Sequence, residues 1–260
     1  MTKKEQLKFI EDNYPLYNNH ISNRRIRHTF FDTIETELQA YLLGFYAADG
    51  SIDEKRKTLR VHLQSGDSEI VYLFKDSISP DARTFTVAPH IVTGRNGMKV
   101  NAHASFGVDI TSSKLCNALV DLGIGYNKSV AELKIPSIPE DLVKHFIRGY
   151  FDGDGSVSGD KQKQFNLVGT INFLLPLQQI LIEELGFSKT KLDQRHKERD
   201  NEIRSLRYCG INQCITFRDW LYKDATIYLE RKKNIFDSYI SFERVQRKCS
   251  VDGCDKKHFG

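Results

Sequence analysis

The chain has 260 residues, of which 40% are hydrophobic and 28% charged, and its net charge is +4 at pH 7. This modest basicity does not identify nucleic acid as the partner, since many enzymes are equally basic. The apolar run 40–48 is far shorter than the ~20 residues that cross a bilayer, which excludes a membrane span there. The five cysteines show no secreted-type framework and no signal-type stretch opens the chain, so we expect a reduced, intracellular, cytoplasmic protein.

Residues 1–30 form a basic arm whose densest cationic run is 24–28. Two interpretations of this arm stay open: a small helical element of the DNA-binding type, or a partly ordered leader. A helix is then predicted to begin at Thr36-x-x-Gln39, which has the form of a capping box. This apolar helix is predicted to end at the pair Asp49-Gly50.

After Asp49 the hydrophobic period changes from helical to alternating. Residues 58–64 alternate between polar and apolar side chains, which predicts a half-buried strand. Asn96-Gly97 is a strong hairpin signal. The further elements predicted in this half are a helix at about 68–78, strands at 83–92 and 98–110, and a helix at 112–122.

The same order of elements follows a second apolar helix. This helix is predicted to begin at Ser137-x-x-Glu140, with Pro139 in its first turn, and to end at Asp154-Gly155. The further elements predicted here are strands near 156 and 165, a helix at 171–185, strands at 189–196 and 202–209, and helices at 212–222 and 226–242. An αββαββα unit is therefore predicted twice, within residues 31–136 and 137–248.

The two predicted helices end in copies of one nine-residue pattern, Leu42–Gly50 and Ile147–Gly155. Small residues four positions apart, Gly44 and Ala48 in the first copy and Gly149 and Gly153 in the second, leave one face of each helix smooth. Two such helices can pack backbone to backbone. Each helix then brings one carboxylate, from Asp49 or Asp154, to the same end of the contact. Paired carboxylates on a basic protein are a natural divalent-metal site for phosphate chemistry.

Two other interpretations of the pattern are weaker. A single copy could be a buried helix that ends in an Asp-Gly turn, but the presence of two copies argues against this. Residues 152–156 also resemble the start of a calcium-binding loop. Such a loop needs Gly and Glu where this chain has Val157 and Lys163, so it is excluded.

The paired motif resembles the LAGLIDADG family of homing endonucleases, in the single-chain form with two motif copies. The resemblance covers nearly all of residues 31–242, although Ala47 replaces an acid that the second copy keeps as Asp152. It implies an α+β fold of two pseudo-twofold-related αββαββα units, with antiparallel DNA-binding sheets and both motif helices packed at the domain junction.

The resemblance also implies an activity: a monomeric, site-specific endonuclease that cuts both strands of double-stranded DNA at a long, two-half recognition site. Asp49 and Asp154 would hold Mg²⁺, with Ala48 and Gly153 in the same metal site, and Mn²⁺ or Ca²⁺ would substitute. An intron-encoded or free-standing enzyme is expected. The alternative is an RNA maturase or a DNA-binding regulator on the same fold, without cleavage.

Two lysines occupy places where the family has a basic residue that points into the catalytic pocket, Lys128 and Lys232. Such a lysine would neutralise phosphate charge in the transition state or polarise the attacking water. For each of them a plain surface lysine is the alternative.

Polar and cationic side chains recur along the predicted strands. In 58–64, for example, the polar residues share one strand face and the apolar residues share the other. Arg, Gln and His on an exposed sheet face can contact base edges and phosphates in a DNA groove. The candidate DNA-binding residues are Arg60, His62, Gln64, Arg95, Lys99, Lys191, Arg195, Lys197, Arg204 and Arg207.

The segment 249–260 carries three candidate zinc ligands, Cys249, Cys254 and His258. A structural zinc site normally has four ligands. Either the native protein continues into a small zinc finger or this tail is a remnant of one.

Overall fold

A computed structural model of the chain describes residues 1–19, 24–93, 97–126, 133–158, 162–194 and 203–240. The helices are α1 (Lys3–Asn13), α2 (Glu37–Asp49), the short 3-10 helix η1 (Ser65–Asp67), α3 (Ser68–Ile78), α4 (Ser113–Asp121), α5 (Glu140–Asp154), α6 (Ile171–Leu185), α7 (Ile211–Tyr222) and α8 (Glu230–Ile240). The strands are β1 (Tyr17–Asn19), β2 (Arg24–Ile26), β3 (Ser51–Asp53), β4 (Thr58–Gln64), β5 (Thr84–Val87), β6 (His90–Thr93), β7 (Lys99–Ala102), β8 (Ser105–Thr111), β9 (Ser156–Ser158), β10 (Gln164–Thr170), β11 (Asp193–Gln194) and β12 (Ile203–Cys209).

One architecture is used twice, from α2 to α4 (the first half) and from α5 to α8 (the second half). The first four-stranded sheet has the order β3-β4-β8-β5 and the second has the order β9-β10-β12-β11, so corresponding strands occupy corresponding places. All of these pairings are antiparallel. The predicted α+β fold with a repeated αββαββα order is confirmed.

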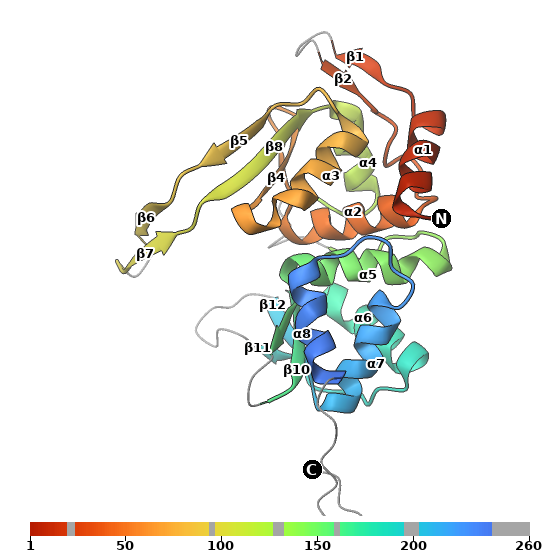
Figure 1. The fold of residues 1–260 in the computed structure, drawn as a ribbon, viewed down its shortest axis with the longest axis vertical. Coiled ribbons are helices and arrows are strands. Elements are labelled where there is room, and N and C mark those ends of the chain that lie inside the picture. Colours follow the sequence, from red (N-terminus) through yellow and green to blue (C-terminus); the bar gives the residue numbers. More distant parts are fainter. Residues whose placement is uncertain (20–23, 94–96, 127–132, 159–161, 195–202, 241–260) are drawn as a thin grey trace, which may run out of the picture.

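The two motif helices, α2 and α5, lie side by side between the halves, and both sheets lie on the same side of the molecule (Figure 1). Helices α3 and α4 pack against the first sheet, while α6 and α7 pack against the second. The strand alternation explains this packing. In β4 the side chains of Leu59, Val61 and Leu63 are buried toward the helices.

The first half carries an extension that sequence periodicity did not resolve. Each of the two long strands predicted at 83–92 and 98–110 is in fact two strands. β5 and β8 pair within the sheet, whereas β6 and β7 pair only with each other, as a ribbon that projects from the body (Figure 1). The break after β5 contains Pro89, which has no N–H to donate to a strand ladder.

Three other predicted elements differ from the structure. Ser137 does not cap α5: the residue before the helix is Pro139, and no side chain caps the helix there. In the second half the strand predicted at 189–196 begins only at Asp193, and its described part is β11 (Asp193–Gln194). Helix α8 begins at Glu230 rather than near residue 226. By contrast, the basic arm does contain a helical element, as one of its two interpretations expected: α1 lies within residues 1–30 and is followed by the hairpin β1–β2 instead of a second helix.

Within the part of the chain that the structure describes, no helix is both long enough and apolar enough to span a membrane.

Candidate functional site

The motif helices contact one another through their glycines. A Cβ atom on Gly44 would lie 1.9 Å from the carbonyl oxygen of Phe146, and a Cβ on Gly149 would lie 2.0 Å from that of Tyr41. Real Cβ atoms do not approach an atom so closely, so only glycine fits at either place. The backbone-to-backbone contact that the motif predicts is therefore present.

The two helices run parallel, because the residue pairs in contact advance together along both. At the last turn, a Cβ on Gly153 would lie 2.4 Å from the Cβ of Ala48 and 3.0 Å from Oδ2 of Asp49. Asp49 and Asp154 are the final residues of α2 and α5, and both are exposed. The fold thus brings two solvent-accessible carboxylates to one end of the helix pair.

The donor chemistry of this end suits a hard divalent cation. Carboxylate and backbone carbonyl oxygens are the ligands that Mg²⁺ accepts, and Mg²⁺ usually keeps several waters and takes only one or two protein carboxylates. Among the described residues, no group of three or more His, Cys, Asp or Glu side chains could hold a metal. Any ion between Asp49 and Asp154 would therefore take its remaining ligands from backbone, water or substrate phosphate.

Lys232 lies beneath this end of α5, with only 3% of its surface exposed. Its ammonium donates to the carbonyl oxygens of Phe151 at 2.7 Å, Gly153 at 3.0 Å and Gly155 at 2.6 Å. The last carbonyls of a helix have no partner within the helix, so Lys232 caps α5 with all three of its N–H donors. Burial lowers the pKa of Lys232 to about 8, and the attraction of Asp152 opposes that shift.

Asp152, the acid whose place Ala47 takes in the first copy of the motif, is fully buried at a point where several elements meet. Its carboxylate accepts hydrogen bonds from the Tyr222 hydroxyl at 2.7 Å, the Tyr41 hydroxyl at 2.9 Å and the Leu229 backbone N–H at 2.8 Å. Burial raises the pKa of Asp152, and these hydrogen bonds oppose that rise. The carboxylate ties α2 and α7 to the beginning of α8, so its role here is structural.

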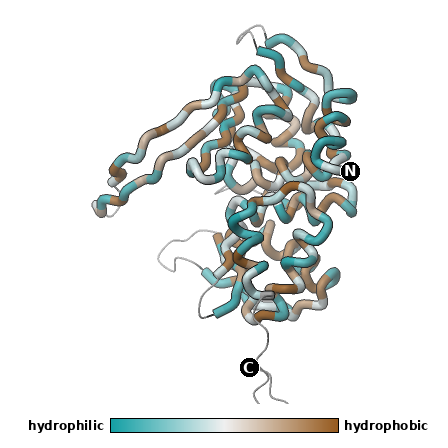
Figure 2. Tube along the Cα trace, in the orientation of Figure 1, coloured by the Kyte–Doolittle hydropathy of each residue, from teal (hydrophilic) through white to brown (hydrophobic). Residues whose placement is uncertain are grey.

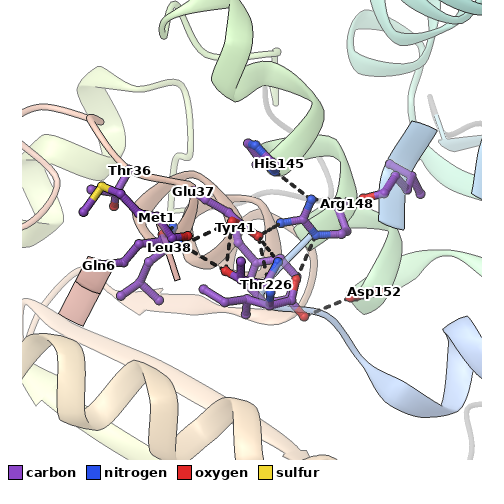
Figure 3. Close-up of polar contacts among 12 residues, drawn as sticks. Met1, Gln6, Thr36, Glu37, Leu38, Tyr41, His145, Arg148, Asp152 and Thr226 are labelled. Carbon is purple, nitrogen blue, oxygen red and sulfur yellow. Dashed lines mark hydrogen bonds and ion pairs between the residues drawn. The ribbon is translucent and has the colours of Figure 1, made fainter. Parts of the chain in front are cut away.

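A second buried network joins the other end of the helix pair (Figure 3). The Arg148 guanidinium, which is 0% exposed, donates to Glu37 Oε1 at 2.6 Å. Arg148 also donates to Nδ1 of His145 at 2.7 Å. Glu37 accepts in addition from the backbone and side chain of Thr226 and from the side-chain amide of Gln6 in α1. Sequence reasoning missed this network, although an arginine inside the apolar run 146–151 was a usable signal.

The outer face of the first sheet carries the predicted polar residues, but its charge is partly neutralised. Arg60, His62 and Gln64 are exposed along β4, as their alternation predicts. Asp109 of β8 binds Arg60 through two hydrogen bonds of 2.8 and 2.7 Å. A shallow pocket of 370 Å³ is lined by residues that include Arg60, Asp109, His62 and Phe85.

The β6–β7 ribbon continues this face outward. It exposes Ile91, Val92 and Val100 as well as Lys99, and Figure 2 shows the hydrophobic residues along it. From residue 82 to residue 108 the sequence has three Lys or Arg and no Asp or Glu. Among its described residues, this ribbon carries one cation, Lys99, and no acidic side chain, and it is partly apolar.

The second sheet also carries cationic side chains among its described residues. Arg207 is exposed on β12 and pairs with Asn166 of β10 in the ladder. Arg204 is half-buried, and strand alternation places it on the face of the buried Leu206 instead of the face of Arg207. Lys191 is exposed just before β11.

Several predicted site residues lie outside the described residues. These are Arg95, Lys128, Arg195, Lys197 and the three Cys and His residues of the tail, Cys249, Cys254 and His258. Their proposed roles stay predictions.

Comparison with known protein families finds a match within the second half. Residues 141–219 match the family described as LAGLIDADG-like domain. No curated protein sequence matches the chain.

Solved structures with a similar arrangement include the following three. Full-length DUF199/WhiA from Thermatoga maritima is 15% identical with a TM-score of 0.49, and the match covers 87% of this chain and 66% of that one. The homing endonuclease I-WcaI bound to its DNA recognition sequence is 15% identical with a TM-score of 0.49, covering 78% and 87%. The LAGLIDADG meganuclease I-AabMI bound to uncleaved DNA is 12% identical with a TM-score of 0.45, covering 80% and 90%.

Proposed function

We propose, on the premise that residues 141–219 form a LAGLIDADG-like domain, that the chain is a metal-dependent endonuclease that cuts both strands of DNA at a specific site. The observation that carries this proposal is the pair of exposed carboxylates, Asp49 and Asp154, at the common end of two parallel helices. A purely structural helix pair has no need of two like charges at one exposed end, where they repel each other.

The proposed cofactor is Mg²⁺, held by Asp49 and Asp154 with help from the neighbouring backbone of Ala48 and Gly153. When bound, the metal would supply an activated water and stabilise the departing oxygen of a phosphodiester. The protein itself contributes the placement. The close helix contact holds the two carboxylates together, and the Lys232 cap holds the end of α5 in position.

The proposed substrate is a long stretch of double-stranded DNA, with one half-site on each sheet, bound by a monomer. Both sheets lie on the same side of the molecule (Figure 1), and a major groove admits a two-stranded β-ribbon. Exposed polar side chains that support this include Arg60, His62, Lys99 and Arg207. A role in intron-type mobility belongs to the same proposal.

A nucleic-acid-binding protein without cleavage, such as a regulator or an RNA maturase, is the second candidate. One observation favours it. Lys232, which the resemblance names as catalytic, already uses its donors on backbone carbonyls. The catalytic lysine proposed for the other half, Lys128, lies outside the described residues.

The deciding experiment incubates the protein with a randomised plasmid library and Mg²⁺, maps any cuts, and then tests Asp49→Asn and Asp154→Asn on the selected site. Each variant should lose double-strand cleavage. Binding of that site should stay within about tenfold, or ~1.4 kcal/mol, because each carboxylate repels phosphate when no metal is bound. Asp12→Asn, an exposed carboxylate on α1, is the matched control and should change neither. Binding by the wild type without linear product, in any divalent metal, would favour the second candidate.

A further inference from the structure

Two adjacent cations at the beginning of α8, Arg231 and Lys232, point in different directions. Lys232 is buried beneath the end of α5. The side chain of Arg231 is 56% exposed. Successive helix residues are turned by about 100°, so one residue faces the protein and the next faces solvent close to the same helix end.

Arg231 is held by a carboxylate from the other half of the molecule. Its Nε donates to Oδ1 of Asp67 at 2.8 Å and its Nη2 donates to Oδ2 at 2.8 Å. Asp67 ends η1 at the start of α3, and only 11% of its side chain is exposed. A two-bond pair of this kind fixes the plane of the guanidinium as well as its position. Arg231 therefore bridges the first and second halves in a fixed orientation.

The start of α8 lies against the end of α5, because Lys232, the residue after Arg231, donates to the carbonyl oxygens of Gly153 and Gly155 on either side of Asp154. Hydrogen bonding to Asp67 raises the pKa of Arg231, and the charges of Asp152 and Asp49 add to that rise. The charges of Asp49 and Asp154 likewise act to raise the pKa of the neighbouring Lys232, against the larger effect of burial. The guanidinium thus lies within electrostatic reach of Asp49 while remaining open to solvent.

We infer that Arg231, oriented by Asp67, is the cation that contacts a DNA phosphate at the cleavage centre, while Lys232 is a positioning residue for the end of α5. This assignment rests on the proposed function and deepens it. A guanidinium has five N–H donors. Asp67 takes two of them, which leaves three that can reach a phosphate from the exposed side.

The test begins with a DNA site selected from a randomised library by binding alone, so that it does not depend on cleavage. Arg231→Ala should lower the single-turnover cleavage rate at saturating protein by at least about 100-fold, as loss of one oriented donor to a developing charge does. The slope of log affinity against log salt should fall by about one, because one phosphate contact is lost. Arg231→Lys should recover little of the rate, since a lysine cannot replace a two-bond guanidinium contact.

Asp67 acts through Arg231, and a double-mutant cycle measures this. Asp67→Asn should lower the rate in the wild-type background and cause no further loss in the Arg231→Ala background. Lys232→Met should lower the melting temperature yet leave the salt slope unchanged, because its ammonium does not reach DNA.

Arg25 supplies the matched control. It forms the same two-bond pair with Asp81, at 2.7 and 3.0 Å, and is 54% exposed, but it lies in the N-terminal hairpin. Arg25→Ala should leave both rate and slope unchanged. An unchanged saturated rate for Arg231→Ala, or an equal loss for Arg25→Ala, would overturn the assignment.

Failure of the proposed function gives a different result. If the wild type binds its selected DNA and cuts none, the endonuclease proposal is wrong. The salt slope then still decides the phosphate contact, and an unchanged slope for Arg231→Ala would overturn it.

Discussion

At the N-terminal end of the α2–α5 contact, Glu37 and Arg148 are buried and bonded to each other, whereas at the C-terminal end Asp49 and Asp154 are exposed and carry the same charge. One pair of helices thus uses charged residues in two ways. Burying a charge costs several kcal/mol unless partners satisfy it, and Arg148 and Glu37 have partners on every side. The carboxylates of Asp49 and Asp154 are exposed to solvent, so they do not carry this desolvation cost.

The comparison indicates where substitutions should affect folding and where they should affect function. Changes along the glycine contact and at the buried end should alter stability. Changes at the exposed end should alter activity, as proposed for Asp49 and Asp154.

The largest effect is expected at Gly44 and Gly149, the glycines through which α2 and α5 contact each other. Replacing Gly44 or Gly149 by Ala should abolish the folded state or separate the halves, because the new methyl group would meet a backbone carbonyl at 1.9 or 2.0 Å. The cost should exceed the ~1–3 kcal/mol typical of overpacking, since a backbone cannot rotate away as a side chain can. Thermal unfolding measures this. Gly66→Ala, where nothing lies within 4 Å, is the control, and equal melting temperatures for all three variants would contradict the contact.

Breaking the buried pair should come next. Arg148→Met leaves Glu37 without its cation, and loss of one partner of a buried pair costs ~3–5 kcal/mol. Adding Glu37→Gln to this variant should restore part of the loss, because the unpaired charge is then removed. Urea unfolding of both variants measures the difference. A double variant less stable than Arg148→Met would mean that Glu37 serves mainly its other partners.

His145 should make the buried end sensitive to acid. Burial, and then the charge of Arg148, lower the pKa of His145 to about 4 from 6.5, and its Nδ1 accepts a hydrogen bond from Arg148. The unfolded chain therefore binds the proton more readily, so the unfolding free energy should fall by about 1–3 kcal/mol as pH drops from about 6.5 to about 4. His145→Gln should lack this component. The measurement is the difference in unfolding free energy between wild type and His145→Gln across that pH range. Asp152, whose raised pKa has the opposite effect on stability, contributes equally to both proteins and cancels in this difference. Parallel pH profiles would show that His145 is not the source.

The smallest effect concerns how the two helices begin. The Thr36 hydroxyl accepts from the Gln39 N–H at 3.2 Å, so Thr36→Ala should cost ~1 kcal/mol. Ser137→Ala should cost nothing measurable, because no side chain caps α5. Denaturant midpoints would separate the two. A loss at Ser137 as large as that at Thr36 would restore the capping role that the sequence pattern predicted for it.

The local sequence pattern was enough to predict the repeated order of elements, the smooth helix faces at Gly44 and Gly149, and the polar outer face of β4. These features depend on residues two, three or four positions apart, whose relative directions secondary structure alone determines. Boundaries were predicted less well where a local rule had a competitor. Pro139 occupies the cap position that Ser137 was expected to serve, and Pro89 divides a strand that periodicity read as continuous.

What the tertiary structure alone decided is which charged side chain meets which partner. Glu37 and Arg148, or Asp67 and Arg231, are more than one hundred residues apart in sequence, and no spacing rule connects them. Arg231 and Lys232 have the same charge and are neighbours, yet one caps α5 and the other binds Asp67. That difference follows from how α8 is rotated about its axis relative to the end of α5. Packing between the elements sets this rotation, so the residues next to Arg231 and Lys232 in sequence do not predict it.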